Sequence, residues 1–196
     1  SKFNLKLKKV ELTDIHFVYS NLATGQHYGT KIHNLDLRGE FTEKQFTLNA
    51  ISKLHIDEIK SEKVTLLANK SAAFNLSIQV DQEKDIFEIP DATIFISNLP
   101  FKLRGKIDPE KLRFDISARQ LKLEEVANKL SNQLDQIKAF EGQGFCNFDL
   151  KIEGANKKEV LPTVVCNFDI KNGALREPSQ KTKFTGIHLN GKYSNE

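Results

Sequence analysis

Apolar and polar residues alternate along most of this chain. The clearest cases are two nearly identical strings, CNFDLK at 146–151 and CNFDIK at 166–171. A period of two is typical of a β-strand with one apolar face and one solvated face. The chain is therefore predicted to consist mainly of such strands.

A looser form of the same unit ends in glycine. It occurs as LDLRG at 35–39, FKLRG at 101–105, LKIEG at 150–154 and IHLNG at 187–191. Glycine inside a strand often marks a bulge or a bend. We therefore expect each of these strands to bend or bulge at its glycine.

The alternation predicts about a dozen strands joined by short turns. Their expected ranges are 3–7, 10–19, 32–41, 46–56, 64–68, 72–80, 87–89, 93–96, 99–107, 112–118, 144–152, 164–173 and 183–191. Because Ala50 and Ile51 interrupt the alternation, we expect a bulge there. Pro90 and Pro100 should mark strand starts or bends, since proline cannot donate to a ladder. No segment resembles the crossover helices of parallel sheets, so the sheet is expected to be antiparallel.

The period changes once, between residues 123 and 140. Apolar residues there have the spacing of one helical stripe, namely Leu123, Val126, Ala127, Leu130, Leu134 and Ile137. Glu124 and Glu125 lie near the start, where the helix dipole favours negative charge. Gly142 and Gly144 follow the stripe and would end the helix. The expected fold is mainly β, with one amphipathic α-helix at 123–140.

The composition agrees with strands that have one solvated face. Of the 196 residues, 39% are hydrophobic and 28% are charged, which is a polar balance for a compact globule. The net charge is +3, with lysines spread along the chain rather than in long runs, whereas a nucleic-acid binder clusters its basic residues on one face. We therefore expect no nucleic-acid partner. No apolar stretch approaches the roughly 20 residues that span a bilayer.

The ends of the chain look like the edges of a larger protein. The sequence opens directly in a predicted strand, ends abruptly at 193–196 and contains no methionine. We therefore interpret residues 1–196 as a single segment of a longer chain, with strands at 1–118, a helix at 123–140 and strands at 144–196. Any membrane anchor would then lie outside this segment.

The two cysteines occupy matching positions in the repeated strings. If these strings form a hairpin centred near residues 156–158, Cys146 faces the Ile170 end of its partner strand and Cys166 faces the Leu150 end. The two Cα atoms would then lie well beyond the roughly 7 Å that a disulfide tolerates. We expect two free, buried thiols that act as small hydrophobes.

The sequence offers no arrangement of residues that is typical of an enzyme. None of the five histidines has a second ligand at zinc spacing, and His16, His55 and His188 fall on the solvated side of predicted strands. Asp36, Asp115, Asp149 and Asp169 alternate with apolar neighbours and should point to solvent. No nucleophile triad, phosphate-binding loop or dinucleotide fingerprint is present. We therefore predict no catalytic residue, no metal and no cofactor.

The order of several segments resembles a known family. VELTDI at 10–15 leads to Tyr19, and IHNLDLRG at 32–39, LLANK at 66–70 and LPFKLRG at 99–105 follow. After the predicted helix come a Gly-x-Gly strand, Pro162, FDIKNGAL at 168–175 and GKYSN at 191–195. Together these features resemble an internal segment of the AsmA-like family of Gram-negative envelope proteins.

That resemblance implies a function. Members of the family resemble the repeating β-groove bridge proteins, in which a helix anchors the chain in the inner membrane and a long curved sheet projects into the periplasm. The sheet is thought to carry phospholipid along an apolar groove toward the outer membrane. The resemblance therefore implies a periplasmic, non-enzymatic role in lipid transport and outer-membrane biogenesis. Its partners would be phospholipid or another acyl-chain ligand, and adjoining segments of the same parent chain.

The candidate groove-lining residues are apolar residues on one side of the predicted strands. They are Phe74, Leu76, Ile78, Phe101, Leu103, Phe114, Ile116, Phe148, Leu150 and Phe168, and the helix would cover part of the groove as a plug through Leu123, Val126, Leu130, Leu134 and Ile137. Alternation is equally compatible with a β-sandwich, a scaffold or adhesion module with a packed core and no lipid. The family resemblance favours the long curved sheet.

Overall fold

A computed structural model describes residues 8–22, 25–41, 43–61, 64–130, 141–157, 160–177 and 182–195. In this part of the chain ten strands form one antiparallel sheet, and each strand pairs with the next strand along the sequence. The sheet is thus a meander whose two open edges are β1 and β10. This arrangement confirms the predicted fold class, and the alternative of two separate stacked sheets is wrong.

The strands are long, and the predicted helix is described over residues 123–130, while its expected continuation to residue 140 lies outside the described residues. The elements are β1 (Lys9–Asn21), β2 (Gln26–Arg38), β3 (Gln45–Ser61), β4 (Val64–Asp81), β5 (Ile86–Ile96), β6 (Leu99–Ile107), β7 (Lys111–Lys122), α1 (Leu123–Leu130), β8 (Glu141–Ala155), β9 (Thr163–Glu177) and β10 (Thr182–Ser194). The predicted segments 64–68 and 72–80 belong to the single strand β4, and 87–89 and 93–96 both belong to β5.

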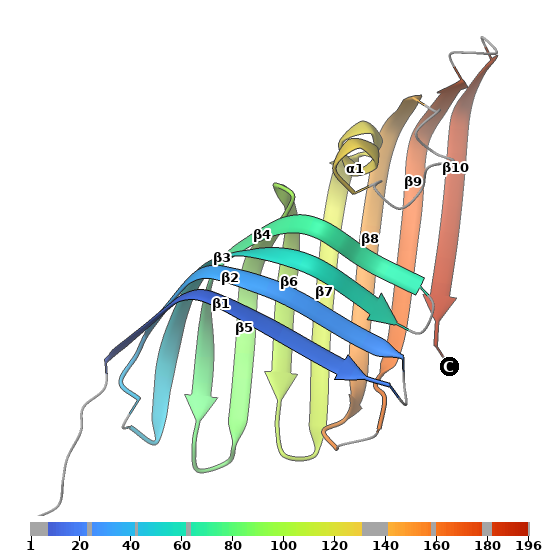
Figure 1. Ribbon diagram of the computed structural model, residues 1–196. Helices are drawn as coiled ribbons and strands as arrows, with labels where there is room; N and C mark the ends of the chain where they lie inside the picture. The colour runs from blue at the N-terminus through green and yellow to red at the C-terminus, as the bar shows by residue number, and fades with distance from the viewer. Residues whose placement is uncertain are drawn as a thin grey trace, which may run out of the picture.

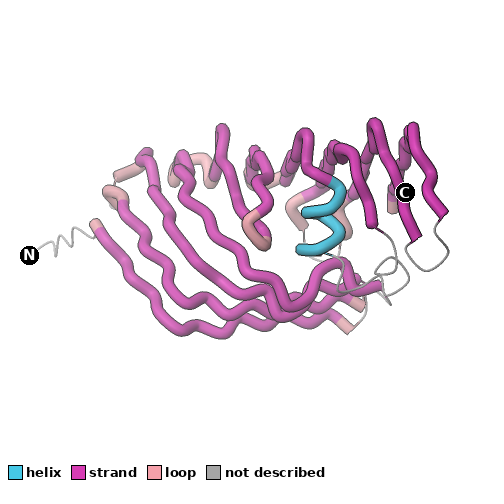
Figure 2. Tube along the Cα trace, turned by 90° about the horizontal axis from the view of Figure 1, so that it is seen from above, coloured by secondary structure: helices cyan, strands magenta, loops and turns pink. Residues whose placement is uncertain are grey.

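The sheet is strongly curved. Figure 1 shows β1–β4 crossing in front of the later strands. In Figure 2 α1 lies on the inner side of the curved sheet, between β1–β4 and the later strands. The chain exposes 13461 Å² in total, whereas a compact protein of its mass exposes about 9,400 Å². An open, curved layer accounts for this large surface better than a closed globule does.

The strand register places the apolar side chains on one side of the sheet. Residues that lie directly opposite each other in a ladder point to the same face. Phe74 lies opposite Ile94, which in turn lies opposite Phe101. Leu103 lies opposite Ile116 in the next pair of strands. We call this side the apolar face and the other side the polar face.

The two repeated strings lie side by side in β8 and β9. Phe148 faces Phe168 at the centre of the pairing, so each string runs antiparallel to its copy about this point. Cys146 lies opposite Ile170 and Cys166 opposite Leu150, as predicted. Four residues of strand separate the two thiols along the ladder, about 13 Å, and both cysteines are free. They are half-buried rather than fully buried, so that part of the prediction is only partly right.

One detail of the predicted strands is wrong. Ala50 and Ile51 pair without interruption on both sides, so β3 has no bulge there. Instead the register shifts near Asn34, between Ala118 and Leu121, and at residue 90 of β5. The last shift agrees with the expectation that Pro90 marks a bend. The predicted strand 3–7 lies outside the described residues.

The buried core consists of two clusters, each made by neighbouring strands. Leu99, Phe101, Ala118 and Leu121 form one, which lies on β6 and β7. Ala50, Leu76 and Ala92 form the other, which lies on β3, β4 and β5. Within the part of the chain that the structure describes, neither cluster joins β1–β3 to β7–β10. Among the described residues, each buried cluster is therefore built by nearby strands of the sheet.

Candidate functional site

The apolar face is the first candidate site. The structure brings all ten predicted lining residues to this one face, on β4, β6, β7, β8 and β9. Leu76 lies opposite Ala50, Phe114 opposite Ile152, and Leu150 opposite both Ile116 and Cys166. The rings of Phe101 and Phe148 meet edge to face with centroids 6.2 Å apart. The face is thus a continuous apolar surface across the sheet.

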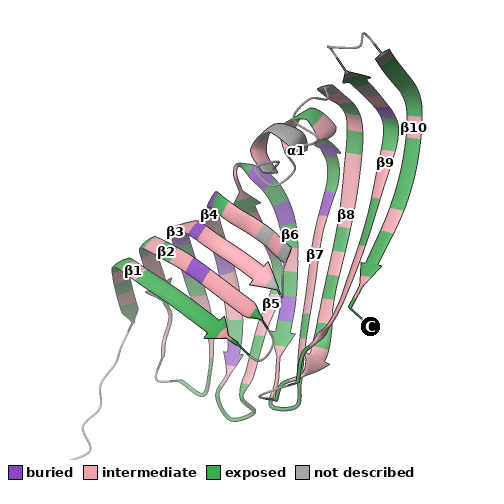
Figure 3. Cartoon of the chain, turned by 45° about the vertical axis from the view of Figure 1, so that its right-hand side comes forward, coloured by how far each residue is buried: buried purple, intermediate pink, exposed green. Residues whose placement is uncertain are grey.

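Exposure varies along this surface. Phe101 and Leu76 in the middle of the sheet are buried, with 8% and 9% of their surface exposed. Large apolar side chains on the same face are exposed at the start of β5, at Phe87, and in the outer strands, among them Phe17, Tyr19, Phe168, Leu189 and Tyr193. Figure 3 shows this contrast between the edge strands and the centre. The two ends of the apolar face are therefore open to an apolar ligand.

Helix α1 lies on the apolar face. Val126 packs against the cluster of Leu99, Phe101, Ala118 and Leu121. At Gly142 of β8, a side-chain carbon would lie 3.3 Å from Cδ2 of Leu123, so the start of the helix also touches the sheet. Of the other predicted plug residues, the side chain of Leu130 and both Leu134 and Ile137 lie outside the described residues.

Among the described residues, one charged side chain interrupts the apolar face, and sequence analysis missed it. Lys70 of β4 lies opposite Ile56 of β3 and is only 4% exposed. Its Nζ donates a hydrogen bond to the carbonyl oxygen of Lys129 in the last turn of α1, at 2.7 Å. The signal was present in the sequence, because Ala72, Phe74, Leu76, Ile78 and Val80 continue the same alternate positions with apolar residues.

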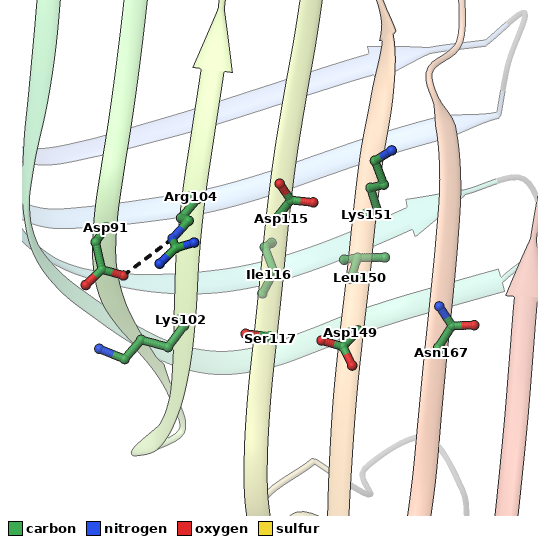
Figure 4. A pocket seen from close by; sticks show the side chains of 10 residues that line it. All are labelled: Asp91, Lys102, Arg104, Asp115, Ile116, Ser117, Asp149, Leu150, Lys151 and Asn167. Carbon is green, nitrogen blue, oxygen red and sulfur yellow. Dashed lines mark ion pairs between the residues drawn. The ribbon is translucent and has the colours of Figure 1, made fainter.

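The polar face carries a shallow hollow over β5–β9 (Figure 4). Its charged residues form a ladder of opposite signs, in which Arg104 of β6 lies opposite Asp115 of β7, and Asp115 opposite Lys151 of β8. Arg104 also lies 3.9 Å from Asp91. Such pairs suit a solvated surface, and exposed ion pairs of this kind contribute little to stability.

The histidines that were expected on the solvated side include a small polar cluster. His16 Nε2 lies 3.1 Å from Oδ2 of Asp57, and His55 Nε2 lies 3.9 Å from Oδ1 of the same carboxylate. Both histidines are partly exposed on the polar face. In the described ranges no group of three or more histidine, cysteine or acidic side chains could hold a metal ion.

Comparison with known proteins adds no relative. No family model, curated protein or solved structure matches the chain. Among the described residues, no helix has the length and apolar character needed to cross a bilayer. What the chain does must therefore be argued from its own two faces.

Proposed function

We propose that this protein binds lipid acyl chains on its curved apolar face and guides them along the sheet. The observation that carries the proposal is the continuous apolar face, which is buried at its centre and exposed at both ends. The sequence resemblance to AsmA-like envelope proteins supports the same reading. On that reading the chain is a periplasmic segment of a protein anchored in the inner membrane, and phospholipid moves along it toward the outer membrane.

The energetics favour acyl chains over a polar ligand. Each methylene that leaves water contributes about 0.8 kcal/mol, so a chain of ordinary length gains on the order of 10 kcal/mol before the costs of association. No specific polar contact is needed to hold it. The ladder of opposite charges on the polar face keeps that side hydrated, so ligand binding is confined to one face.

The binding test uses a pair of phenylalanines that lie on opposite faces of neighbouring strands. Phe168 of β9 is exposed on the apolar face, and Phe145 of β8 is exposed on the polar face, opposite Lys122 and Lys171. We expect Phe168→Ser to weaken binding of the fluorescent polyene methyl parinarate about fivefold, because a half-buried aromatic contact is worth about 1 kcal/mol. Phe145→Ser should leave the affinity unchanged.

A second measurement asks whether the protein carries lipid when it is purified. Organic extracts of protein expressed in a Gram-negative host should contain phospholipid by mass spectrometry, in amounts that exceed those from a control protein of similar size. Absence of lipid from the extract, together with equal methyl parinarate binding by both serine variants, would refute the proposal.

A further inference from the structure

Lys70 is a charge placed where the fold otherwise has apolar side chains. Among the described residues the buried polar side chains are Ser52 and Lys70. Ser52 is satisfied, because its hydroxyl donates to the carbonyl oxygen of Asn34 at 2.8 Å. Within the described ranges Lys70 makes one hydrogen bond, to Lys129, although an ammonium group has three donors.

The two other N–H donors of the Lys70 ammonium group are buried, so they need hydrogen-bond acceptors. A charged group removed from water is costly unless it is paired and hydrogen-bonded. Within the described residues no carboxylate lies at ion-pair distance from Lys70, whereas Arg104, Arg113 and Arg119 on the polar face each have an acidic partner. Among the described residues, the site around Lys70 therefore lacks an anion.

Lys70 lies at the border of the apolar face, just beyond the end of the pairing between β4 and β5. The backbone N–H of Ser97 donates to the carbonyl oxygen of Ser71 at 2.8 Å, and the pairing of β4 with β5 ends at Ala72. From there toward its start, β4 pairs with β3 alone. Lys70 thus lies where β4 separates from β5, between the apolar side of the sheet and the last turn of α1.

We propose that Lys70 binds the anionic head of the acyl ligand, a carboxylate or a phosphate, while the acyl chain lies along the apolar face. This inference rests on the proposed function and specifies that the acyl ligand carries a negative charge. An oxyanion beside Nζ would supply the missing acceptors, and hydrogen bonds to ionised groups are the strong ones. The ligand is therefore expected to be an acidic lipid rather than a neutral one.

The experiment compares a charged probe with its neutral analogue. Fluorescence titrations with parinaric acid and methyl parinarate measure the ratio of the two affinities for the wild-type chain, Lys70→Met, Lys70→Gln and Lys102→Met. Lys102 is the matched control, because it is an exposed lysine on the polar face. Lys70→Gln retains a donor for the carbonyl of Lys129 without the charge, which separates anion binding from support of α1. Far-UV circular dichroism and thermal melts check that each variant is folded.

We expect the wild-type chain to prefer the acid about ten- to a hundredfold, the value of a charge-assisted hydrogen bond. Lys70→Met and Lys70→Gln should remove this preference and leave ester binding intact, and Lys102→Met should keep it. Competition by dioctanoyl phosphatidate against dioctanoylglycerol distinguishes a phosphate head from a carboxylate. Equal binding of acid and ester by the wild-type chain, or a preference that survives in both Lys70 variants, overturns the inference alone. Binding of neither probe overturns the proposed function as well.

Discussion

Gly105 of β6 lies beneath the ring of Phe114 in the neighbouring strand β7. A side-chain carbon at Gly105 would stand 2.5 Å from Cδ1 and 2.6 Å from Cε1 of that ring. Gly191 of β10 has the same relationship to Phe168 of β9, whose ring would overlap the added carbon. The glycines of the repeated unit thus make room for an aromatic ring from the next strand. The expectation of a bend or bulge is wrong at Gly191, where the register is continuous.

Alanine at Gly105 tests this packing. We expect Gly105→Ala to lower the free energy of unfolding by about 1–3 kcal/mol, the usual cost of forcing extra volume into a packed site. Urea unfolding measures the change. The double variant Gly105→Ala with Phe114→Leu should recover part of the loss, because the smaller side chain frees the space above residue 105.

Gly29 of β2 is the matched control for that prediction. It is also buried in a strand, but a side-chain carbon there would lie 3.4 Å from Cβ of Asp57, which is an ordinary contact. Gly29→Ala should be neutral or stabilise by up to about 1 kcal/mol, since glycine in a strand has a larger entropy to lose on folding. Equal destabilisation at both positions would show that loss of glycine, rather than contact with Phe114, is responsible.

The repeated strings supply a second internal control. Asn147 of β8 accepts a hydrogen bond from the backbone N–H of Gln120 at 2.8 Å and donates to Asp169 at 2.9 Å. Gln120 lies in the register shift of β7 with a φ of 54°. Asn147→Ala should therefore destabilise the chain by about 1 kcal/mol, the net value of a lost hydrogen bond.

Asn167 occupies the equivalent position in the second string, but it faces a regular part of the ladder, opposite Asp149. It is exposed, so Asn167→Ala should change the free energy of unfolding by less than about 0.5 kcal/mol. Thermal melts of the two single variants give the comparison directly. If both substitutions have the same effect, Asn147 does not support the bulge.

The local alternation of apolar and polar residues predicted most of the fold, because in a meander each strand pairs with the next strand along the chain. The pairing of β8 with β9 could be predicted approximately, since the two repeated strings place Cys146 near Ile170 and Cys166 near Leu150. The continuity of β4 could not be predicted, because Asn69 and Lys70 interrupt the alternation of apolar and polar residues. The strand nevertheless continues through Asn69, where φ is 54°.

The candidate site was predictable in part. A period of two assigns Phe74, Phe101 and Phe148 to one face whatever the curvature of the sheet. Their exposure depends on which strands the curvature brings opposite them, and that is a property of the whole sheet. Lys70 was missed because its burial depends on α1, which lies 59 residues away along the chain.

The two thiols give a prediction about pH. Burial raises the pKa of both Cys146 and Cys166 above the ordinary thiol value. The folded chain therefore favours the neutral thiols, and this stabilisation is complete below the pKa of the unfolded chain. It is lost as the pH rises through the folded-state pKa. Stability of the wild-type chain should thus fall more steeply at alkaline pH than that of the variant with Cys146→Ser and Cys166→Ser. Parallel alkaline profiles in chemical denaturation would contradict this.

The same thiols report whether an acyl ligand occupies the apolar face. Cys166 lies on that face between Leu150 and Tyr193, and Cys146 lies on it opposite Leu121. In single-cysteine variants, saturating oleate should slow alkylation of either thiol by iodoacetamide. We expect the larger effect at Cys166, because its neighbour Tyr193 is 59% exposed and is free to contact the ligand.

Asn167→Cys in a cysteine-free background provides the control for ligand protection. Residue 167 is next to Cys166 in the chain but points to the polar face, where it lines the hollow with Asp149. Its alkylation rate should not respond to oleate, because acyl chains have no reason to leave the apolar side for a ladder of charges. Equal protection at residues 166 and 167 would mean that oleate acts by general aggregation. If neither native cysteine is protected, the acyl chain does not bind to this part of the sheet.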